Sequence, residues 1–422
     1  MQTNLSSEFK GTPDGEAAEA ILRKCVHCGF CTATCPTYQL LGDELDGPRG
    51  RIYLIKEVLE GATPTRKTQS HLDRCLTCRN CETTCPSGVQ YGNLVEIGRR
   101  IVDEKVERPR GEQAVRWLLK EGLTSPLFAP AMKLGQLVRP LLPASLKGKV
   151  APKPSASEQA TANRWPQREH PRKVLMLMGC VQPTMLPNIN SATARVLDVA
   201  GIQTVVAEEA GCCGAIRSHL GDYEGGLADM RRNIDAWWPS VLTHKVEAIV
   251  MNASGCGAAV KDYGHALAHD EAYADKARRI SELTRDLSEL LPELVPVLKP
   301  RIHRQPTARL AFHPPCTLQH AQQLRGGVEA HLGALGFDVQ VSPSESHLCC
   351  GSAGTYSVLQ PTLAYQLRDR KLANLAEVEA QVIVSANVGC IQHLQSGTAV
   401  PVRHWVEVLD EVLQGTSPVY RG

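Results

Sequence analysis

The chain carries the stretch Cys25-Val-His-Cys28-Gly-Phe-Cys31-Thr-Ala-Thr-Cys35-Pro36, and it repeats the same cysteine spacing in Cys75-Leu-Thr-Cys78-Arg-Asn-Cys81-Glu-Thr-Thr-Cys85-Pro86. Both stretches have the pattern C-x2-C-x2-C-x3-C-P. The close spacings let one tight loop wrap three thiolates around a [4Fe–4S] cubane, and in two-cluster proteins the fourth cysteine reaches the other cluster. The paired motifs therefore predict a ferredoxin-type domain with two [4Fe–4S] clusters.

This rule divides the eight cysteines into two crossed sets of ligands. Cluster 1 is expected to be held by Cys25, Cys28, Cys31 and Cys85, and cluster 2 by Cys75, Cys78, Cys81 and Cys35. Structural zinc and disulfides are the alternatives, because four thiolates also suit Zn²⁺. Zinc ribbons usually present two C-x2-C knuckles well apart, whereas here four cysteines fall within eleven residues, twice. The spacer between the motifs predicts a helix over 51–60, and Gly47-Pro-Arg-Gly-Arg51 before it either places charge beside a cluster or forms a plain turn.

The composition is that of a globular protein and excludes several classes of function. The 422 residues are 43% hydrophobic and 21% charged with a net charge of +2, which is not the basic excess of a nucleic-acid binder. The first fifteen residues are polar and lack the apolar core of a secretory signal. Apolar runs are too short to span a bilayer. We therefore expect a cytoplasmic protein that binds no nucleic acid, whose sixteen cysteines serve metal or redox chemistry rather than a disulfide framework.

The cysteines fall into two populations that mark out domains. Eight lie between Cys25 and Cys85, and the other eight are spread from Cys180 to Cys390. Residues 147–171 are rich in Pro, Ala, Ser and charge, as a linker is. Residues 115–146 before it are apolar and basic, and are a candidate for peripheral contact with the inner face of the membrane. The expected division is a helical dicluster domain (1–110), a connecting segment and linker (111–171), and two α/β repeats (172–300 and 301–422).

The second population of cysteines identifies an internal duplication. Cys180, Cys212, Cys213 and Cys256 are matched by Cys316, Cys349, Cys350 and Cys390, at offsets of 136, 137, 137 and 134 residues. Apolar runs predict strands over 173–178, 202–206 and 248–251 and again over 309–312, 338–341 and 381–384, with helices over 191–200, 222–238 and 361–376. Alternating strands and helices indicate parallel sheets. The fold class expected is an α+β multidomain chain with two α/β Cys-Cys-Gly repeats.

The repeat predicts where its thiols meet. In each copy the cysteines follow successive strands, and the carboxyl ends of parallel strands converge at one edge of a sheet. Gly214 and Gly351 after the cysteine pairs suit a backbone that approaches a bulky cofactor closely. Buried free thiols, dithiol–disulfide exchange, and an additional iron–sulfur cluster or other metal are the open interpretations. His313 and His347 stand near the cysteines of the second copy as ligands, tuning residues or ordinary structural histidines, and the first copy has no counterpart.

Paired ferredoxin motifs followed by two Cys-Cys-Gly repeats resemble the family that includes the iron–sulfur subunit of glycolate oxidase. The small subunit of anaerobic glycerol-3-phosphate dehydrogenase and the catalytic subunits of heterodisulfide reductase are relatives of it. The stretches 25–38 and Asn252-Ala-Ser-Gly-Cys256 look most like the glycolate oxidase subunit. The resemblance implies a hetero-oligomeric respiratory complex that oxidises glycolate, or a similar hydroxy acid such as lactate. FAD would lie in a partner dehydrogenase subunit, and quinone would accept the electrons.

One departure from the relatives bears on the chemistry. In heterodisulfide reductase each repeat ends in C-x-x-C and supplies five thiolates, whereas here the first of those positions is Ala253 in one copy and Asn387 in the other. A stand-alone thiol reductase remains the rival interpretation, and a non-catalytic scaffold is a third. No G-x-G-x-x-G follows a predicted strand and no P-loop is present, so the sequence offers no flavin or nucleotide site. We therefore expect no catalytic residues in this chain, only an electron relay.

Overall fold

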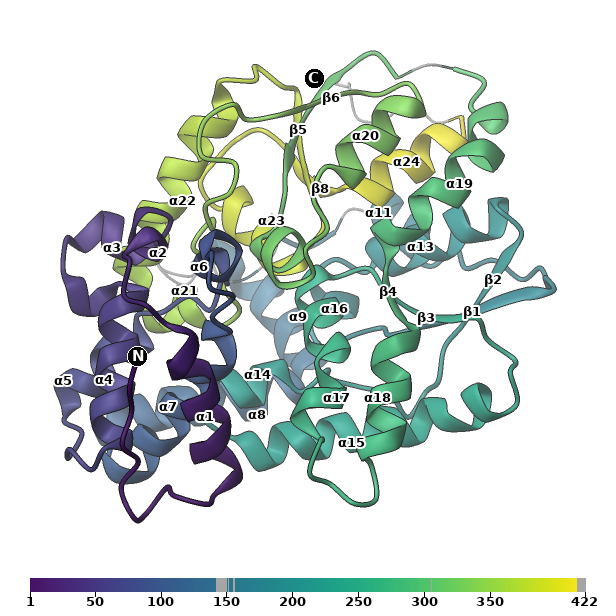
Figure 1. The fold of residues 1–422 in the computed structure, drawn as a ribbon. Coiled ribbons are helices and arrows are strands. Elements are labelled where there is room, and N and C mark those ends of the chain that lie inside the picture. The colour runs from purple at the N-terminus through teal and green to yellow at the C-terminus, as the bar shows by residue number, and fades with distance from the viewer. Residues whose placement is uncertain (142–149, 151, 155, 305, 416–422) are drawn as a thin grey trace.

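The computed structural model describes residues 1–141, 150, 152–154, 156–304 and 306–415, and it has the α+β architecture that the sequence predicts. A helical N-terminal part lies beside two parallel sheets, and the last third of the chain lies close to it in space (Figure 1). The expected boundaries at 110, 171 and 300 are consistent with this arrangement, and we propose them as the division of the chain.

Short helices alternate with the two cysteine loops in the N-terminal part. They are α1 (Pro13–Lys24), α2 (Phe30–Ala33), α3 (Pro36–Leu41), α4 (Pro48–Leu59), α5 (Arg66–Asp73), α6 (Asn80–Thr84) and α7 (Tyr91–Lys105), with a 3-10 turn at Glu44–Asp46. The expected helix over 51–60 is α4, which starts three residues earlier because Pro48 occupies its first turn. Gly98 allows α7 to pack tightly on α4, since a Cβ there would lie 2.5 Å from Cγ1 of Ile55.

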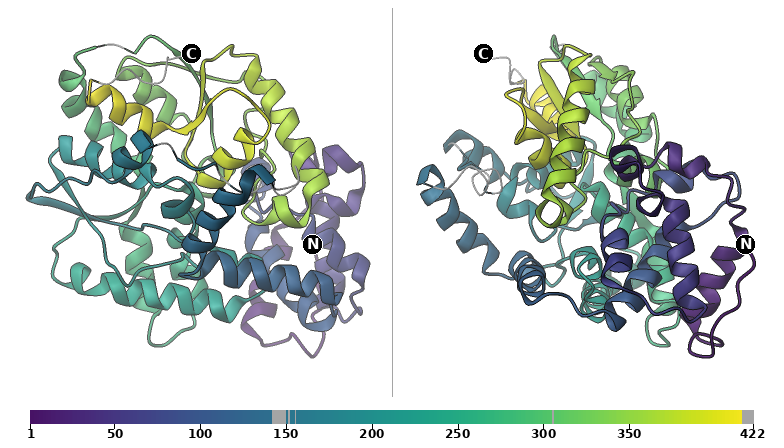
Figure 2. Two further views of the ribbon diagram at one scale, coloured as in Figure 1. Left: turned by 180° about the vertical axis from the view of Figure 1, so that it is seen from behind. Right: turned by 90° about the vertical axis from the view of Figure 1, so that its left-hand side faces the viewer.

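Two helices that bury no side chain fully form the connecting segment. They are α8 (Arg110–Thr124) and α9 (Phe128–Val138), followed by a 3-10 turn at Arg139–Leu141. Helix α11 (Ala156–Ala162) precedes the first sheet. Helices α8 and α9 run across the face of the molecule that the left panel of Figure 2 turns to the viewer. Part of the expected apolar segment, 142–146, and residues 147–149, 151 and 155 of the expected linker lie outside the described residues.

The first repeat is a four-stranded parallel sheet with strand order β2-β1-β3-β4. Its strands are β1 (Arg172–Met176), β2 (Ile202–Val205), β3 (Ala248–Met251) and β4 (Thr284–Asp286). Its helices are α12 (Gln182–Met185), α13 (Asn188–Val199), α14 (Ala215–His219), α15 (Tyr223–Leu242), α16 (Ser254–Lys261), α17 (Tyr263–Ala266), α18 (Ala274–Leu283) and α19 (Leu291–Leu298), with 3-10 turns at Leu287–Leu290 and Lys299–Arg301.

The second repeat has the same topology, with strand order β6-β5-β7-β8. Its strands are β5 (Arg309–His313), β6 (Asp338–Val341), β7 (Val382–Ser385) and β8 (Val402–His404). Its helices are a π-helical turn at Thr317–Ala321, α20 (Gly327–Ala334), α21 (Tyr356–Leu359), α22 (Pro361–Ala376), α23 (Val388–Gln395) and α24 (Trp405–Leu413).

One edge strand of each sheet, β4 in the first and β8 in the second, is not predicted by the sequence pattern. Each has only three residues, and both contain charged side chains, so neither shows an apolar run. The six predicted strands are confirmed to within two residues at each end.

The two repeats interlock around one shared core. Helix α24 of the second repeat packs on α13 of the first, and α19 of the first packs on α20 of the second. Buried side chains from both sheets belong to a single hydrophobic cluster. Backbone contacts join the ends of β3 and β7, where the Ser254 amide donates a 3.0 Å hydrogen bond to the Ala386 carbonyl. Because the core is shared, neither repeat can expose its helices without disrupting the other.

The dicluster part packs directly against the second repeat. Leu76 and Cys78 share a hydrophobic cluster with Cys316, Cys349 and Tyr356. The Thr83 hydroxyl lies 3.1 Å from Nδ1 of His320. Segments about 240 residues or more apart in the chain are thereby brought side by side, as Figure 1 shows for α3 and α22.

Candidate metal centres

The four cysteines expected to bind cluster 1 line one cavity at the edge of the N-terminal part. Cys25, Cys28, Cys31 and Cys85 surround it, together with the backbone of Gly29. Cys28 is exposed, and its neighbours Val26 and Phe30 are 68% and 59% exposed. Four thiols around one small cavity are the donor set that a [4Fe–4S] cluster requires, so the residues fit the group.

The four cysteines expected to bind cluster 2 line a second cavity that is buried deeper. Cys35, Cys75, Cys78 and Cys81 surround it, and Arg51 and Tyr91 complete its wall. Cys81 borders both cavities, so the two thiol sets are adjacent. Each cavity is thus lined by the four cysteines of one expected set, and this second donor arrangement also fits a [4Fe–4S] cluster.

The two cysteine loops share an unusual backbone. His27 and Thr77 have positive φ angles of 57° and 50°, and so do Gly29 and Arg79, at 84° and 57°. Residues with a left-handed backbone conformation at alternate positions bend the loop so that successive thiols point toward its interior. Arg79 adopts this conformation without being glycine, at a cost of about 1 kcal/mol. Its side chain forms an ion pair of 3.6 Å with Asp262 in the first repeat.

A buried guanidinium lies beside the cluster 2 thiols. Arg51 is 1% exposed, and its Nη2 lies 3.5 Å from Oδ1 of Asp46, which is equally buried. Its Nε donates a 2.7 Å hydrogen bond to the carbonyl of His71. The charge interpretation of the Gly47–Arg51 stretch thus agrees with the position of Arg51, a few residues inside α4.

This positive charge acts on the thiols around it. Burial raises the pKa of Cys75, but the guanidiniums of Arg51 and Arg99 outweigh burial and lower it overall. The Thr77 amide also donates to Sγ of Cys75 at 3.4 Å, and the Tyr91 hydroxyl does so at 3.6 Å. Cys78 and Cys81 lack this compensation, and burial raises their pKa. A metal centre with formal positive charge would favour the thiolate form of all three.

The thiols of the first repeat meet where the sequence places them. Cys180 and Cys213 both interact with Cys212, and Cys213 also interacts with Cys256. The neighbouring thiols of Cys180 and Cys213 and the amides of Gly214 and Ile216 lower the pKa of Cys212. Its negative charge lies next to Asp229, where burial and Cys212 raise the carboxyl pKa to about 6. Asp229 also forms ion pairs with Arg232 at 3.0 Å and with Arg217 at 3.5 Å.

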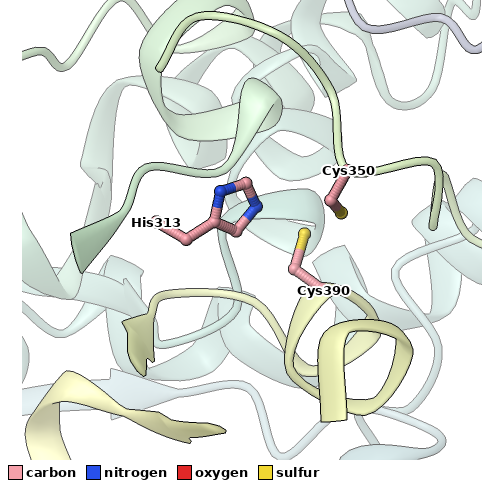
Figure 3. A group of neighbouring side chains, drawn as sticks. All are labelled: His313, Cys350 and Cys390. Carbon is pink, nitrogen blue, oxygen red and sulfur yellow. The ribbon is translucent and has the colours of Figure 1, made fainter. Parts of the chain in front are cut away.

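The thiols of the second repeat form a similar chain with different neighbours. Sγ of Cys316 lies 3.8 Å from Sγ of Cys349, and Cys350 interacts with both Cys349 and Cys390. His313 ends β5 and points at this group (Figure 3). Among the described residues, His313, Cys350 and Cys390 place one donor atom each within 4.8 Å of one another, and His347 does not join them.

The glycines of the Cys-Cys-Gly pairs each lie against the long helix that follows. Gly214 and Gly351 have φ angles of 89° and 88°, and a Cβ there would lie 2.8 Å and 2.4 Å from the carbonyl oxygens of Gly226 and Ala364. Glycine at these positions therefore permits close approach of the backbone to that helix. Asn387, at the lost fifth cysteine position, donates a hydrogen bond of 3.6 Å to Sγ of Cys390.

Charged residues near the second repeat escaped sequence analysis. Lys371 in α22 is buried, and its Nζ donates a 2.6 Å hydrogen bond to the carbonyl of Glu345. A lysine in an amphipathic helix gives no sign that it turns inward, so only the fold reveals it. A cavity of about 290 Å³ between the dicluster part and the first repeat was likewise not foreseen, and Arg79, His219 and Asp262 are among its lining residues.

Among the described residues, no helix combines the length and apolar character needed to cross a membrane.

Comparison with known protein families agrees with both halves of this arrangement. Residues 21–89 match the 4Fe-4S dicluster domain family, and residues 174–261 and 310–395 each match the cysteine-rich domain family. The two matches to the second family cover β1 to β3 of the first sheet and β5 to β7 of the second to within two residues, and they end before β4 and β8. The match to the dicluster family supports iron–sulfur clusters over structural zinc in the N-terminal part.

Similar proteins cover nearly the whole chain. The glycolate oxidase iron-sulfur subunit of Escherichia coli (strain K12) is 55% identical over 98% of this chain and its own full length. A probable glycolate oxidase iron-sulfur subunit of Bacillus subtilis (strain 168) is 30% identical over 93% of this chain and 92% of its own. Lactate utilization protein A of Bacillus licheniformis is 27% identical over 56% of this chain and 99% of its own. From these likenesses and the two cysteine architectures, this chain belongs to the family of glycolate oxidase iron–sulfur subunits.

Proposed function

We propose that this chain is the electron-transfer subunit of a flavin-dependent 2-hydroxy-acid dehydrogenase complex that oxidises glycolate. The observation that carries the proposal is a pair of adjacent cavities, each lined by the four thiols of one expected ligand set, with Cys81 bordering both. Each [4Fe–4S] cluster, when bound, accepts and releases single electrons. Cys25, Cys28, Cys31 and Cys85 would hold one, and Cys75, Cys78, Cys81 and Cys35 the other. The residues of this chain position and insulate the clusters.

The two cavities face different surroundings, and this difference supports an orientation of the subunit in which the cluster 1 cavity faces its partner. Val26 and Phe30 expose apolar surface beside Cys28, so we assign this loop to the FAD-binding partner subunit. Cys78 lies instead against Cys316 and Cys349 of the second repeat. In the part of the chain that the structure describes, no group of side chains suited to removing a proton and a hydride from a hydroxy acid accompanies the thiols, and the partner subunit would supply it.

Quinone is the acceptor that we propose for these electrons. The 290 Å³ cavity is the candidate place for its head group, because Thr77 and Arg79 flank Cys78 on one side and Gly255 adjoins Cys256 on the other. His219 and Arg79 offer hydrogen-bond donors to quinone oxygens. Replacing His219 by Leu should raise the KM for quinone while leaving reduction of an artificial dye unchanged.

The apolar faces of α8 and α9 are the proposed contact with the membrane. Trp117 and Leu118 in α8, and Leu134 and Leu137 in α9, are exposed. The basic residues once expected to attract anionic lipid are partly engaged within the protein: Arg116 pairs with Asp73 at 3.1 Å, and Lys120 pairs with Asp222 at 3.0 Å. Attachment would therefore depend on apolar burial more than on charge.

Anaerobic purification with the partner subunits tests the function. The proposal expects a flavoprotein to copurify, about eight iron and eight sulfide per chain, and cluster reduction by glycolate within turnover time. Cys28→Ser should abolish reduction while the complex stays assembled. Turnover by this chain alone would instead favour a stand-alone thiol reductase, and normal electron flow in Cys28→Ser would favour a scaffold. Comparing the rate of cluster reduction by lactate with that by glycolate decides which of the two hydroxy acids is the substrate.

A further inference from the structure

One buried histidine in the second repeat differs from the other buried histidines that the structure describes. His313 is 1% exposed, and neither of its ring nitrogens has a hydrogen-bond partner. His320, His393 and His404 are also buried, and each uses a ring nitrogen in a hydrogen bond to a backbone carbonyl. A buried imidazole without hydrogen-bond partners is costly, so the position of His313 calls for another kind of partner.

The imidazole of His313 is directed at thiols. Figure 3 shows its ring between β5 and the side chains of Cys350 and Cys390, and the three donor atoms lie within 4.8 Å of one another. Cys316 and Cys349 extend the group, with their sulfurs 3.8 Å apart. Two ligands of one tetrahedral zinc ion lie about 3.5 to 3.8 Å apart, given metal–ligand bonds of about 2.0 to 2.3 Å. The spacing of these donors therefore suits ligands that share a metal atom.

The first repeat lacks the imidazole that makes the second suitable. Leu177, three residues before Cys180, stands where His313 precedes Cys316, and it packs in the apolar core. The charged neighbours differ as well. Asp229, which pairs with Arg217 and Arg232, lies next to Cys212, whereas the buried Lys371 neighbours Cys349 and Cys350. A cation beside thiolates offsets their charge. Four thiols are common to both repeats, but the buried imidazole without a hydrogen-bond partner belongs to the second.

We propose that the second repeat, and not the first, holds a metal centre through His313, Cys350 and Cys390, with Cys316 or Cys349 as the fourth ligand. Imidazole with thiolates suits Zn²⁺ and also iron within an iron–sulfur cluster. The imidazole takes the role that the fifth cysteine fills in related repeats, since Asn387 cannot provide a thiolate. The proposal adds a centre to the two of the proposed function and depends on neither of them being occupied.

Metal and sulfide analysis of the complete, anaerobically purified complex tests this. The wild type should contain one zinc, or additional iron with matching sulfide, beyond the about eight iron of the dicluster part. His313→Leu should lose that additional metal and keep the eight iron, whereas His313→Cys should retain it through a new thiolate. His393→Gln, a change at another buried histidine of the same repeat, and Cys212→Ser in the first repeat should both leave the metal content unchanged.

X-ray absorption at the edge of the additional metal identifies the ligand directly. A nitrogen shell at about 2.0 to 2.1 Å should accompany the sulfur shell at about 2.3 Å in the wild type, and should vanish in His313→Cys. Eight iron with no further metal in the wild type would overturn the proposal, as would full retention of the additional metal by His313→Leu. Fewer than eight iron atoms together with one zinc that depends on His313 would overturn the assignment of two [4Fe–4S] clusters and would support a metal centre in the second repeat.

Discussion

The hydroxyl of Tyr356 donates a 3.1 Å hydrogen bond to the carbonyl oxygen of Arg74, the residue that precedes Cys75. Tyr356 begins α21 in the second repeat, so this bond ties the repeat to the backbone beside the cluster 2 thiols. Cys78 and Tyr356 also belong to one hydrophobic cluster. The position of the second cysteine loop is thus set by the repeat as well as by its own domain.

Tyr356→Phe should weaken this junction without unfolding the chain. Loss of one neutral hydrogen bond costs about 0.5 to 1.5 kcal/mol, and the ring remains to fill its place. Urea unfolding should show that decrease, and amide exchange should rise around Cys75. Tyr53→Phe, at an exposed tyrosine of α4, is the matched control and should change neither. Equal effects from the two variants would mean that the junction does not depend on this bond.

Arg51→Met should lower both stability and the reduction potential of cluster 2. The change leaves the buried Asp46 carboxylate with fewer partners, and breaking a buried ion pair costs about 3 kcal/mol. Removal of a positive charge beside the thiols also disfavours the added electron. Potentiometric EPR titration and urea unfolding measure the two effects. Arg51→Lys keeps the charge, so it should retain most of the potential, and an unchanged potential in Arg51→Met would contradict the electrostatic role.

The crossed ligand sets can be tested through pairs of substitutions. Cys35→Ser should remove about four iron, as should Cys78→Ser and Cys28→Ser. If Cys35 and Cys78 hold the same cluster, their double variant should lose no more iron than either single variant, whereas Cys35→Ser with Cys28→Ser should lose about eight. Iron analysis after anaerobic purification gives the result. The reverse pattern would show that each motif binds its own cluster with all four cysteines.

Stability should fall with acid because of His404. Its Nε2 donates a 2.8 Å hydrogen bond to the Asn252 carbonyl, and burial lowers its pKa from 6.5 to about 3. Below pH 6.5 the unfolded chain therefore binds a proton that the folded chain does not. The free energy of unfolding should consequently decrease by about 1.4 kcal/mol per pH unit from this residue, from pH 6.5 down toward about 3.

His404→Gln isolates that contribution, because glutamine can still donate to Asn252 but does not titrate. Urea unfolding between pH 5 and 7 gives the free energy of unfolding as a function of pH. This free energy should fall less steeply with acid in the variant, with a slope that approaches a difference of one bound proton toward pH 5. Parallel curves for the two proteins would mean that His404 is not the titrating group.

Leu134→Gln with Leu137→Gln should weaken binding to membranes. Both side chains project apolar surface from α9, at 62% and 71% exposure, and burial of apolar area supplies the binding energy that we propose. Cosedimentation of the complex with vesicles should fall at least several-fold. Leu242→Gln, at another exposed leucine, should have no effect. Retained sedimentation, accompanied by loss of the partner subunit, would instead assign α9 to subunit assembly.

Much of the fold follows from local sequence. The strand at 248–251 and the helix at 361–376 have the predicted bounds, because a short apolar run between polar turns, or a proline-started helix, carries its own pattern. Strands β4 and β8 have no such pattern. They form because the edges of β3 and β7 offer unpaired backbone groups, which is a property of the assembled sheet.

The candidate metal centres likewise have features that local sequence predicts and features that only the assembled fold creates. Spacing predicted the two ferredoxin loops, the duplication and the convergence of four thiols in each repeat, since these depend on a few neighbouring positions and on the direction of parallel strands. Tertiary structure alone decided that Cys78 lies against Cys316, that Arg51 is buried beside Cys75, that His313 is buried without a hydrogen-bond partner, and that Lys371 neighbours Cys349 and Cys350. Those neighbours come from segments far apart in the chain, and only packing of the whole molecule selects which side chains lose water and meet.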